Sequence, residues 1–226
     1  MKKESGFIFF DKPAEITSHG VIAFLRHITM IKKIGHAGTL DPFATGLLIV
    51  GVGREATKRL DEFLKKDKEY EATLHLGVST DTYDCEGKIL NDYVGDKKNL
   101  KEIKKVVADF VGEQDQIPPM FSAKKINGKK LYELARKGIE VERKPSRIKI
   151  YKIKILKYSW PNLKLRIKCS SGTYIRSLAS DIGGNLGCGA HLSALRRTAI
   201  SKFSVKKAVK KDKINQENWQ NFLRLL

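Results

Sequence analysis

The residues best suited to chemistry lie in a glycine-rich stretch from residue 35 to residue 46, which reads Gly-His-Ala-Gly-Thr-Leu-Asp-Pro-Phe-Ala-Thr-Gly. It contains one imidazole, His36, and one carboxylate, Asp41, among small residues that let a loop approach a ligand closely. Pro42 biases Asp41 toward an extended backbone, which projects its carboxylate from the loop. The local pattern is equally typical of a turn before proline, so it leaves catalytic and structural roles for Asp41 open.

Metal-dependent chemistry would require further ligands beside Asp41. The candidates are His36, Asp11 and the acidic stretch 81–86, which reads Asp-Thr-Tyr-Asp-Cys-Glu. This stretch lacks the regular alternation and distant glutamate of an EF-hand and is more typical of a solvated turn. We predict no metal site, and a metal-dependent nuclease remains an alternative at this stage.

Two later stretches also combine polar and apolar groups. Residues 170–176, Ser-Ser-Gly-Thr-Tyr-Ile-Arg, connect an expected strand to an expected helix. Tyr174 and Arg176 would lie in the first turn of this helix, where free backbone N–H groups favour the binding of anions. Leu195 adds an apolar side chain next to Arg196 and Arg197. Taken alone, such residues more often belong to a core edge or a basic surface.

The elements that must position these residues follow from hydrophobic periodicity. Strands and helices alternate without a regular βαβ repeat, which favours an α+β fold with a mixed, mostly antiparallel sheet flanked by helices. Residues 114–147 are predicted to be a basic insert with one short helix near 130–137, and a bulge is expected near Tyr151. The predicted strands are 6–10, 47–52, 70–76, 148–160 and 163–169, and the predicted helices are 17–28, 56–64, 99–111 and 173–186.

The distribution of charge indicates a polyanionic partner. The chain has 44 Lys and Arg residues against 25 Asp and Glu, a net charge of +19. Residues 1–120 contain 18 basic and 19 acidic residues, whereas residues 121–226 contain 26 and 6. A uniform lysine bias would not spare the first half, so nucleic acid is the favoured partner.

Composition also bears on the compartment. No apolar run approaches the ~20 residues of a membrane helix, so no membrane association is expected. The apolar run before Asp11 is too short for a signal peptide. The three cysteines are odd in number and lack metal-like spacing, which favours reduced thiols in the cytoplasm.

The order of motifs along the chain resembles the TruB family of tRNA pseudouridine synthases, relatives of dyskerin. The resemblance spans residues 11 to about 203, and Gly-Thr-Leu-Asp-Pro is its most specific part. The motifs are Asp11-Lys12-Pro13, Gly35–Gly46, Lys68-Glu69-Tyr70, Leu76–Thr82, Pro119–Ala123, Lys130–Arg136, Gly172–Arg176 and Leu186–His191.

The resemblance implies a pseudouridine synthase catalytic fold over residues 1–205. It further implies that insert 114–147 grips an RNA stem-loop, and that the T-loop uridine of tRNA, at position 55, is converted to pseudouridine without a cofactor. Family members usually carry a C-terminal PUA domain, whereas residues 206–226 are expected to form only a short tail. The expected partner is the tRNA T-stem-loop, and a monomer without a protein partner is expected.

The resemblance also assigns roles to individual residues. Asp41 matches the nucleophile, Arg176 its pairing arginine, and Tyr70 the active-site tyrosine that stacks on the target base. Substrate contacts are expected from His36, Tyr174, Leu195, Lys12 and Arg197. Contacts with the RNA backbone are expected from Lys124, Lys125, Lys129, Lys130 and Arg136.

These residue types suit the implied reaction, because an everted base needs an aromatic face and an apolar wall, and a dry carboxylate needs a cation to stay charged. The sequence leaves open whether Asp41 attacks the sugar C1′ or the base C6, and which group removes the C5 proton. A non-catalytic RNA-binding or chaperone protein is the alternative that charge alone would support.

Overall fold

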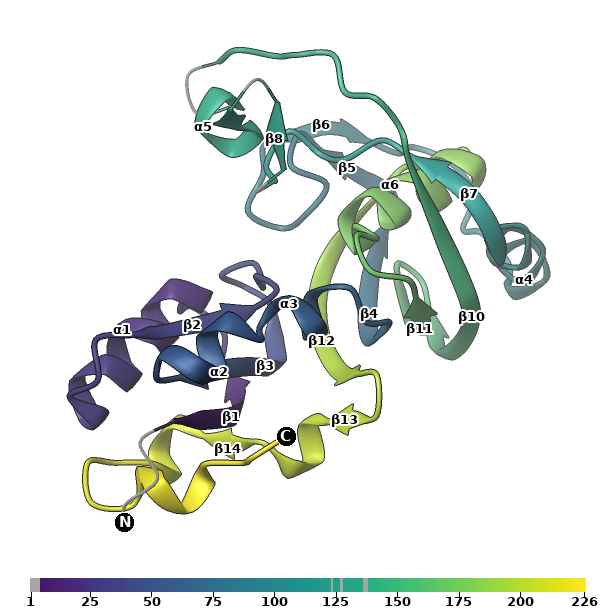
Figure 1. Ribbon diagram of the computed structural model, residues 1–226. Helices are drawn as coiled ribbons and strands as arrows, with labels where there is room; N and C mark the ends of the chain where they lie inside the picture. Colours follow the sequence, from purple (N-terminus) through teal and green to yellow (C-terminus); the bar gives the residue numbers. More distant parts are fainter. Residues whose placement is uncertain (1–4, 123, 127, 136–137) are drawn as a thin grey trace. The chain divides into compact units, whose positions relative to one another are not determined.

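The structure is a computed structural model that describes residues 5–122, 124–126, 128–135 and 138–226, without the side chains of residues 125, 126, 129 and 130 (Figure 1). The chain divides into two compact units. Unit 1 comprises Met1–Glu71 and Leu195–Leu226, and unit 2 comprises Ala72–Ala194. Strands β4 (Lys68–Leu76) and β12 (Ala190–Ile200) contribute residues to both units.

Unit 1 is built around strands that are buried on both faces. Strand β1 pairs antiparallel with β3, β3 pairs antiparallel with β2 and parallel with β12, and β14 adds parallel to β1. Its elements besides β4 and β12 are β1 (Gly6–Lys12), α1 (Ser18–Thr29), β2 (Ile34–Ala37), β3 (Thr45–Val52), α2 (Arg54–Lys58), α3 (Asp61–Leu64), β13 (Phe203–Ser204), β14 (Val209–Lys210) and the 3-10 turns η1 (Val205–Lys207), η2 (Lys211–Lys213) and η3 (Trp219–Phe222).

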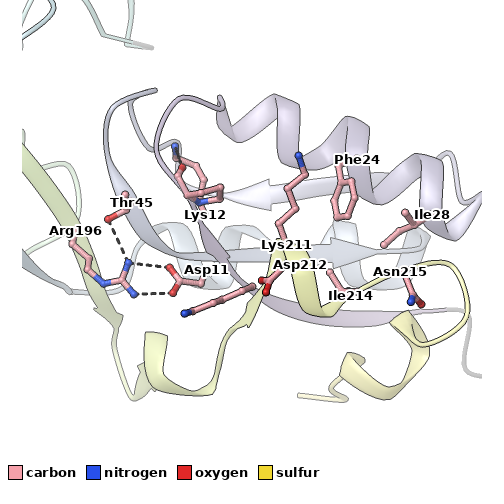
Figure 2. Close-up of a pocket in the computed structure, with 12 residues that line it drawn as sticks. Asp11, Lys12, Phe24, Ile28, Thr45, Arg196, Lys211, Asp212, Ile214 and Asn215 are labelled. Atoms are coloured by element: carbon pink, nitrogen blue, oxygen red, sulfur yellow. Dashed lines mark hydrogen bonds and ion pairs between the residues drawn. The ribbon is translucent and has the colours of Figure 1, made fainter.

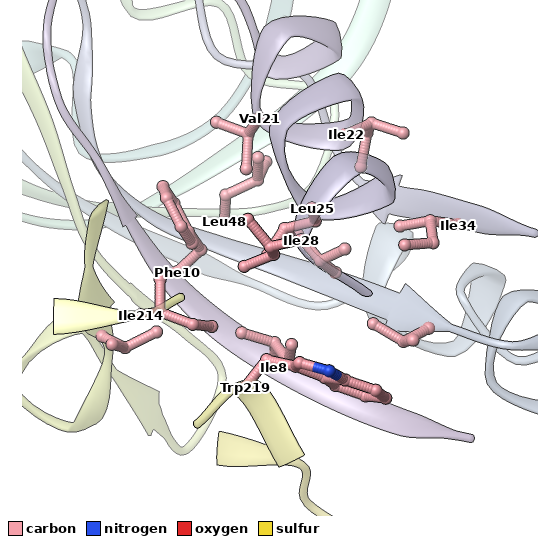
Figure 3. Close-up of a cluster of buried hydrophobic side chains, with 13 residues drawn as sticks. Ile8, Phe10, Val21, Ile22, Leu25, Ile28, Ile34, Leu48, Ile214 and Trp219 are labelled. Atoms are coloured by element: carbon pink, nitrogen blue, oxygen red, sulfur yellow. The ribbon is translucent and has the colours of Figure 1, made fainter. Parts of the chain in front are cut away.

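The alternation of side chains along β1 supplies two hydrophobic cores. Ile8 and Phe10 pack with the apolar side of α1 and with Trp219, as Figure 3 shows. Phe7 and Phe9 point to the opposite face, toward α2 and α3. Residues 206–226 are therefore a structural part of unit 1, because β14 extends its sheet and Trp219 enters its core.

Unit 2 contains a sheet of β4, β11, β10 and β7, in that order, with helices α4 and α6 in contact with each other. A hairpin of β5 and β6 and a hairpin of β8 and β9 are separate from it. Its further elements are β5 (Val78–Thr80), β6 (Ile89–Asp92), α4 (Leu100–Asp109), β7 (Gly112–Gln116), β8 (Lys125–Ile126), β9 (Lys129–Lys130), α5 (Leu131–Ala135), β10 (Ser146–Ser159), β11 (Asn162–Cys169) and α6 (Ile175–Asn185).

The α+β class and the mixed, mostly antiparallel sheet predicted from the sequence are confirmed. Helix α4 begins at the predicted place, because Asn99 and Glu102 form a capping box. The bulge expected near Tyr151 is present as a register shift between Ile150 and Lys152. No helix in the described part of the chain is long and apolar enough to span a bilayer.

One helix prediction is wrong. Residues 56–64 form parts of two short helices, α2 and α3, instead of one. The break lies at Leu60, whose side chain fills the space that Gly35 and Gly51 leave: a Cβ at these glycines would lie 2.9 Å and 3.2 Å from Leu60. Tertiary packing of Leu60 therefore overrides the local helical pattern.

Candidate active site

The loop between β2 and β3 carries Asp41 and is fixed by contacts inside unit 1. Asp41 is half-buried, and its carbonyl accepts a hydrogen bond from the N–H of Ala44 at 3.1 Å. The buried Ser18 hydroxyl donates to the carbonyl of Leu40 at 3.1 Å and accepts from its N–H at 2.8 Å. Because Ser18 is the first residue of α1, the helix anchors the residue just before Asp41.

A second anchor acts on the residue after Asp41. Lys12 is fully buried, and its ammonium donates to the carbonyls of Pro13, Ile16 and Pro42 at 2.9, 2.6 and 3.0 Å. The N–H of Glu15 also donates to Pro42 at 3.0 Å. Lys12 thus tethers the Asp41 loop to the end of β1, and its predicted contact with substrate stays a prediction.

Arg197, on strand β12, is a buried cation that contacts this loop. Its side chain is 1% exposed, and its guanidinium donates to the carbonyls of Leu47 at 2.7 Å and Gly38 at 2.9 Å. Gly46 is required beside it, because a Cβ there would lie 2.3 Å from the Arg197 carbonyl oxygen. Burial lowers the pKa of Arg197, whereas its interaction with the Tyr70 side chain and the charge of Asp41 oppose this shift.

Arg196, the neighbour of Arg197, has a different environment, because successive residues of a strand point to opposite faces. Its guanidinium forms a two-pronged ion pair with Asp11, at 2.7 and 3.1 Å (Figure 2). This pair borders a cavity of about 680 Å³ in unit 1, between the end of β1, helix α1 and the segment from Lys210 to Asn215. The structure therefore separates two arginines that the sequence presents as one basic patch.

Three further predicted site residues belong to unit 1. Tyr70 and Leu195 are each 8% exposed. The pKa of His36 is lowered by burial, and also by the charges of Arg197 and His19, so its imidazole is neutral at pH 7. The Nδ1 atom of His36 is buried and has no hydrogen-bond partner among the described residues. The polar groups that sequence motifs placed together, Asp41, Tyr70, His36 and Arg197, are thus linked within one unit.

Arg176 lies in unit 2 and forms a buried ion pair there. Its guanidinium donates to Asp84 Oδ2 at 3.1 Å, and both side chains are almost fully buried. It also donates to the carbonyls of Thr82 at 3.2 Å and Phe121 at 2.6 Å. Asp41 belongs to unit 1, so the pairing of Arg176 with Asp41 stays a prediction.

Asp84 is a buried partner of Arg176 that the sequence motifs did not indicate. The acidic stretch 81–86 is a turn, as expected, but Asp84 is only 3% exposed. Its Oδ1 accepts hydrogen bonds from the Thr82 hydroxyl at 2.6 Å and from the N–H of Glu86 at 3.1 Å. Since Arg176 follows 92 residues later, no local spacing could have revealed the pair.

Tyr174 is fixed by a second residue that the sequence did not indicate. The Gln116 amide clamps its backbone, accepting from the Tyr174 N–H at 2.8 Å and donating to its carbonyl at 3.0 Å. Gln116 is 4% exposed and ends strand β7. This clamp fixes the entry of helix α6 and hence the position of Arg176 two residues later.

The predicted RNA-backbone lysines are described only in part. Lys124 is half-buried and donates to the Ser146 hydroxyl at 2.7 Å, which connects the interior of the insert to its C-terminal end. The side chains of Lys125, Lys129 and Lys130, and the whole of Arg136, lie outside the described residues. In the part of the chain that the structure describes, no three His, Cys, Asp or Glu side chains gather as metal ligands would.

Comparisons with known proteins identify the family. Residues 26–175 match the TruB family pseudouridylate synthase N-terminal domain, and residues 176–224 match the tRNA pseudouridylate synthase B C-terminal domain. The chain is 53% identical over 198 residues to tRNA pseudouridine synthase B of Protochlamydia amoebophila, covering 88% of this chain and 75% of that one. It is 48% identical over 219 residues to the Clostridium tetani protein of the same name, with 97% and 75% covered.

Solved structures agree with this match. A Cbf5-Nop10-Gar1 complex contains a chain 31% identical to this one, with a TM-score of 0.76 over 99% of this chain and 61% of that chain. An H/ACA RNP bound to a substrate RNA contains another, at 31% identity and a TM-score of 0.67, over 91% and 50%. The chain thus spans a half to three-fifths of these larger proteins. Both the resemblance and the fold predicted from the motifs are confirmed, and the chain belongs to the TruB family of pseudouridylate synthases.

Proposed function

We propose that this pseudouridylate synthase acts on tRNA, converts the T-loop uridine at position 55 to pseudouridine, and uses Asp41 as its nucleophile. The choice of tRNA rests on relatives at 53% and 48% identity that are named tRNA pseudouridine synthase B. The reaction is an isomerisation: the bond from the ribose C1′ to N1 breaks, the uracil rotates, C1′ bonds to C5, C5 loses its proton, and N1 takes up a proton. The bond that Asp41 forms as nucleophile, to C1′ or to C6, breaks again before the product leaves. The cytoplasm is the proposed compartment, as expected for reduced thiols.

The environment of Asp41 carries this proposal. Anchors on both sides, Ser18 on Leu40 and Lys12 on Pro42, leave the Asp41 backbone little freedom. The buried Arg197 guanidinium interacts electrostatically with its carboxylate. A carboxylate nucleophile must be ionised in a water-poor site, and a fixed cation nearby stabilises that state. A loop that merely formed a turn would not need a buried arginine tied to both of its ends.

The neighbouring groups suit an everted uridine. Tyr70 offers an aromatic face, and its side chain interacts with the Arg197 guanidinium, which donates to the carbonyls of Gly38 and Leu47 on either side of the Asp41 loop. Leu195 supplies an apolar wall on β12. The neutral His36 has a buried Nδ1 without a partner among the described residues, which leaves it a hydrogen bond for the nucleotide. Arg176 and Tyr174 are proposed as the contribution of unit 2, and the lysines of the insert as phosphate contacts.

Release of tritium from a T-stem-loop RNA labelled at C5 of its uridine tests the proposal. The wild-type chain is expected to release tritium equally with and without EDTA, because no metal is proposed to take part. Asp41→Asn is expected to bind the RNA with wild-type affinity and to release no tritium. Asp61→Asn, which changes an exposed carboxylate of unit 1, is the matched control and is expected to keep full activity.

Other outcomes would point elsewhere. RNA binding without tritium release from the wild type would indicate a non-catalytic RNA-binding protein. Cleavage of the RNA that EDTA abolishes would indicate the nuclease alternative. Normal release by Asp41→Asn would remove Asp41 from the reaction.

A further inference from the structure

The outward side of strands β10 and β11 in unit 2 carries cations that face one another across the strands. The three successive cross-strand pairs that lie on this side are basic on both strands. We name these six residues, together with Tyr151, the β10–β11 cationic face. The pairs are Lys152 with Lys168, Lys154 with Arg166, and Lys157 with Lys164.

Two irregularities in β10 keep these lysines on the exposed side. Ile148 and Ile150 are buried, so regular alternation would also turn Lys152 and Lys154 inward. The register shift between Ile150 and Lys152 reverses the phase and leaves both lysines exposed. A second shift, between Ile155 and Lys157, returns Lys157 to the same side. The two register shifts in β10 therefore place its lysines on one face of the sheet.

This arrangement places like charges directly opposite one another. Like charges directly opposite each other on neighbouring strands are destabilising. Residues 146–169 contain eight Lys and Arg and no Asp or Glu, and the carboxylate that pairs with Arg147 and Lys149 is Glu113 of β7. Such a concentration of positive charge on an exposed surface suggests a role in binding an anion.

Protection of a sheet edge explains only half of the array. Strand β7 pairs with β10 only from Ser146 to Ile150, so the rest of β10 lacks this neighbour, and lysines there would discourage aggregation. Strand β11, however, lies between β4 and β10 in the sheet, and it carries the opposing cations. The basic residues of β11 need another explanation.

Tyr151 adds an aromatic surface to the same region. The ammonium groups of Lys149 and Lys168 each lie 6.0 Å from the centre of its ring, and the residue is 41% exposed. An exposed aromatic ring between cations suits a ribose or base as well as phosphates. This combination favours nucleic acid over a membrane surface or an acidic protein.

The face lies away from the insert that is proposed to grip the stem-loop. The insert joins β10 at its Ser146 end, where β7 also ends. At about 3.3 Å per residue, Lys152 to Lys157 lie roughly 20 to 36 Å along β10 from Ser146. The loop before Arg176 follows β11 at that same Ser146 end, since the N–H of Ser170 donates to the carbonyl of Lys149.

We propose that the β10–β11 cationic face binds the phosphate backbone of an RNA helix outside the modified loop, as a second RNA contact of the enzyme. The inference rests on the proposed function, since it takes the occupant to be another part of the same RNA. Its contribution is to affinity and placement rather than to chemistry.

Binding of two RNAs as a function of salt concentration tests this inference. One RNA is the T-stem-loop alone, and the other is the same stem-loop with its helix extended by a full turn. The variant is Lys152→Gln, Lys154→Gln, Lys168→Gln. For the longer RNA, the slope of log affinity against log salt is expected to shrink by about 0.9 for each phosphate that the variant no longer neutralises, hence by about 2.7 for three. The slope for the short stem-loop and its tritium release are expected to stay at wild-type values.

The matched control removes three exposed lysines of α4, as Lys101→Gln, Lys104→Gln, Lys105→Gln. It changes the net charge equally and is expected to leave both slopes unchanged. Urea unfolding of the face variant should show stability equal to or above the wild type, since repulsion is relieved. The inference would be overturned if the variant changed the slope equally for both RNAs or changed it for neither. It would also be overturned if the variant lost binding to phosphatidylserine vesicles while its binding to the longer RNA stayed at the wild-type value. Absence of tritium release by the wild type would instead count against the proposed function.

Discussion

Among the described residues, each unit of the protein buries one arginine that was predicted as a site residue, and the two are stabilised differently. In unit 2, Arg176 faces the carboxylate of Asp84 at 3.1 Å and two backbone carbonyls. In unit 1, Arg197 is tied to two backbone carbonyls and Tyr70, and its charge acts on Asp41. Arg176 thus forms an ion pair with a carboxylate of its own unit, whereas the charge of Arg197 attracts the carboxylate of the candidate nucleophile, Asp41.

The Arg176 side chain is therefore held mainly by an ion pair, whereas the Arg197 side chain is held by hydrogen bonds to backbone carbonyls. A buried ion pair depends on both partners, because the one left behind becomes an uncompensated charge. A guanidinium that donates to two backbone carbonyls needs its planar, forked shape, because the two acceptors lie in different directions. Substitutions in the two units should therefore have different consequences: a loss of stability in unit 2, and a loss of both stability and turnover in unit 1.

Asp84→Ala is expected to have the largest effect on stability. It leaves Arg176 buried without its carboxylate, and breaking a buried pair in this way lowers the free energy of unfolding by about 3–5 kcal/mol. Urea denaturation measures the loss, with the exposed Asp109→Ala as control, for which a change within about 0.5 kcal/mol is expected. A loss below about 1 kcal/mol would show that the pair contributes little.

Arg197→Lys should weaken both stability and turnover. An ammonium lacks the fork that reaches the carbonyls of Leu47 and Gly38 together, and removing one hydrogen bond to a charged group costs about 1.5–3 kcal/mol. We expect a comparable loss of unfolding free energy and about 10- to 100-fold slower tritium release. Arg196→Lys is the matched neighbour, and its half-exposed ion pair predicts a loss below about 1 kcal/mol. Wild-type turnover by Arg197→Lys would refute the role of this guanidinium.

His36 should make unit 1 sensitive to acid. Burial and the charge of Arg197 lower its pKa below the ordinary 6.5, so the unfolded chain takes up a proton at a pH where the folded chain does not. Stability is then lost as pH falls below about 6.5, by at most about 1.4 kcal/mol per pH unit. Unfolding measured from pH 8 to pH 5 should show a smaller loss for His36→Gln than for the wild type or the exposed His27→Gln. Identical pH profiles for all three would contradict this assignment.

Glu15→Gly is expected to give a small gain. Glu15 adopts a positive φ of 68°, a backbone conformation that is unfavourable for residues other than glycine. Its N–H donates to the carbonyl of Pro42. Glycine relieves this strain but loses more chain entropy, so the net gain in unfolding free energy is roughly 0.5 kcal/mol. Thermal unfolding compares it with Glu15→Ala, for which no gain is expected. A loss in the glycine variant would show that the Glu15 side chain itself stabilises the loop.

Local patterns were reliable where a short segment decides its own structure. Asn99 and Glu102 fixed the start of α4, and the change of alternation near Tyr151 correctly predicted a bulge. The helix over 56–64 failed because Leu60 packs against Gly35 and Gly51, which are distant in sequence. Periodicity describes which faces are apolar, but it does not contain the shape of the surface that receives them.

The sequence by itself determined the α+β class, the family through its ordered motifs, and the identity of Asp41 and Tyr70 as candidates. Only the tertiary structure decided which arginine meets which partner: Arg176 with Asp84, and Arg197 with the ends of the Asp41 loop. It also decided that Lys12 is a buried tether. Residue type and spacing specify what a side chain can do, whereas burial and contacts between distant segments set the charge, partner and orientation with which it acts.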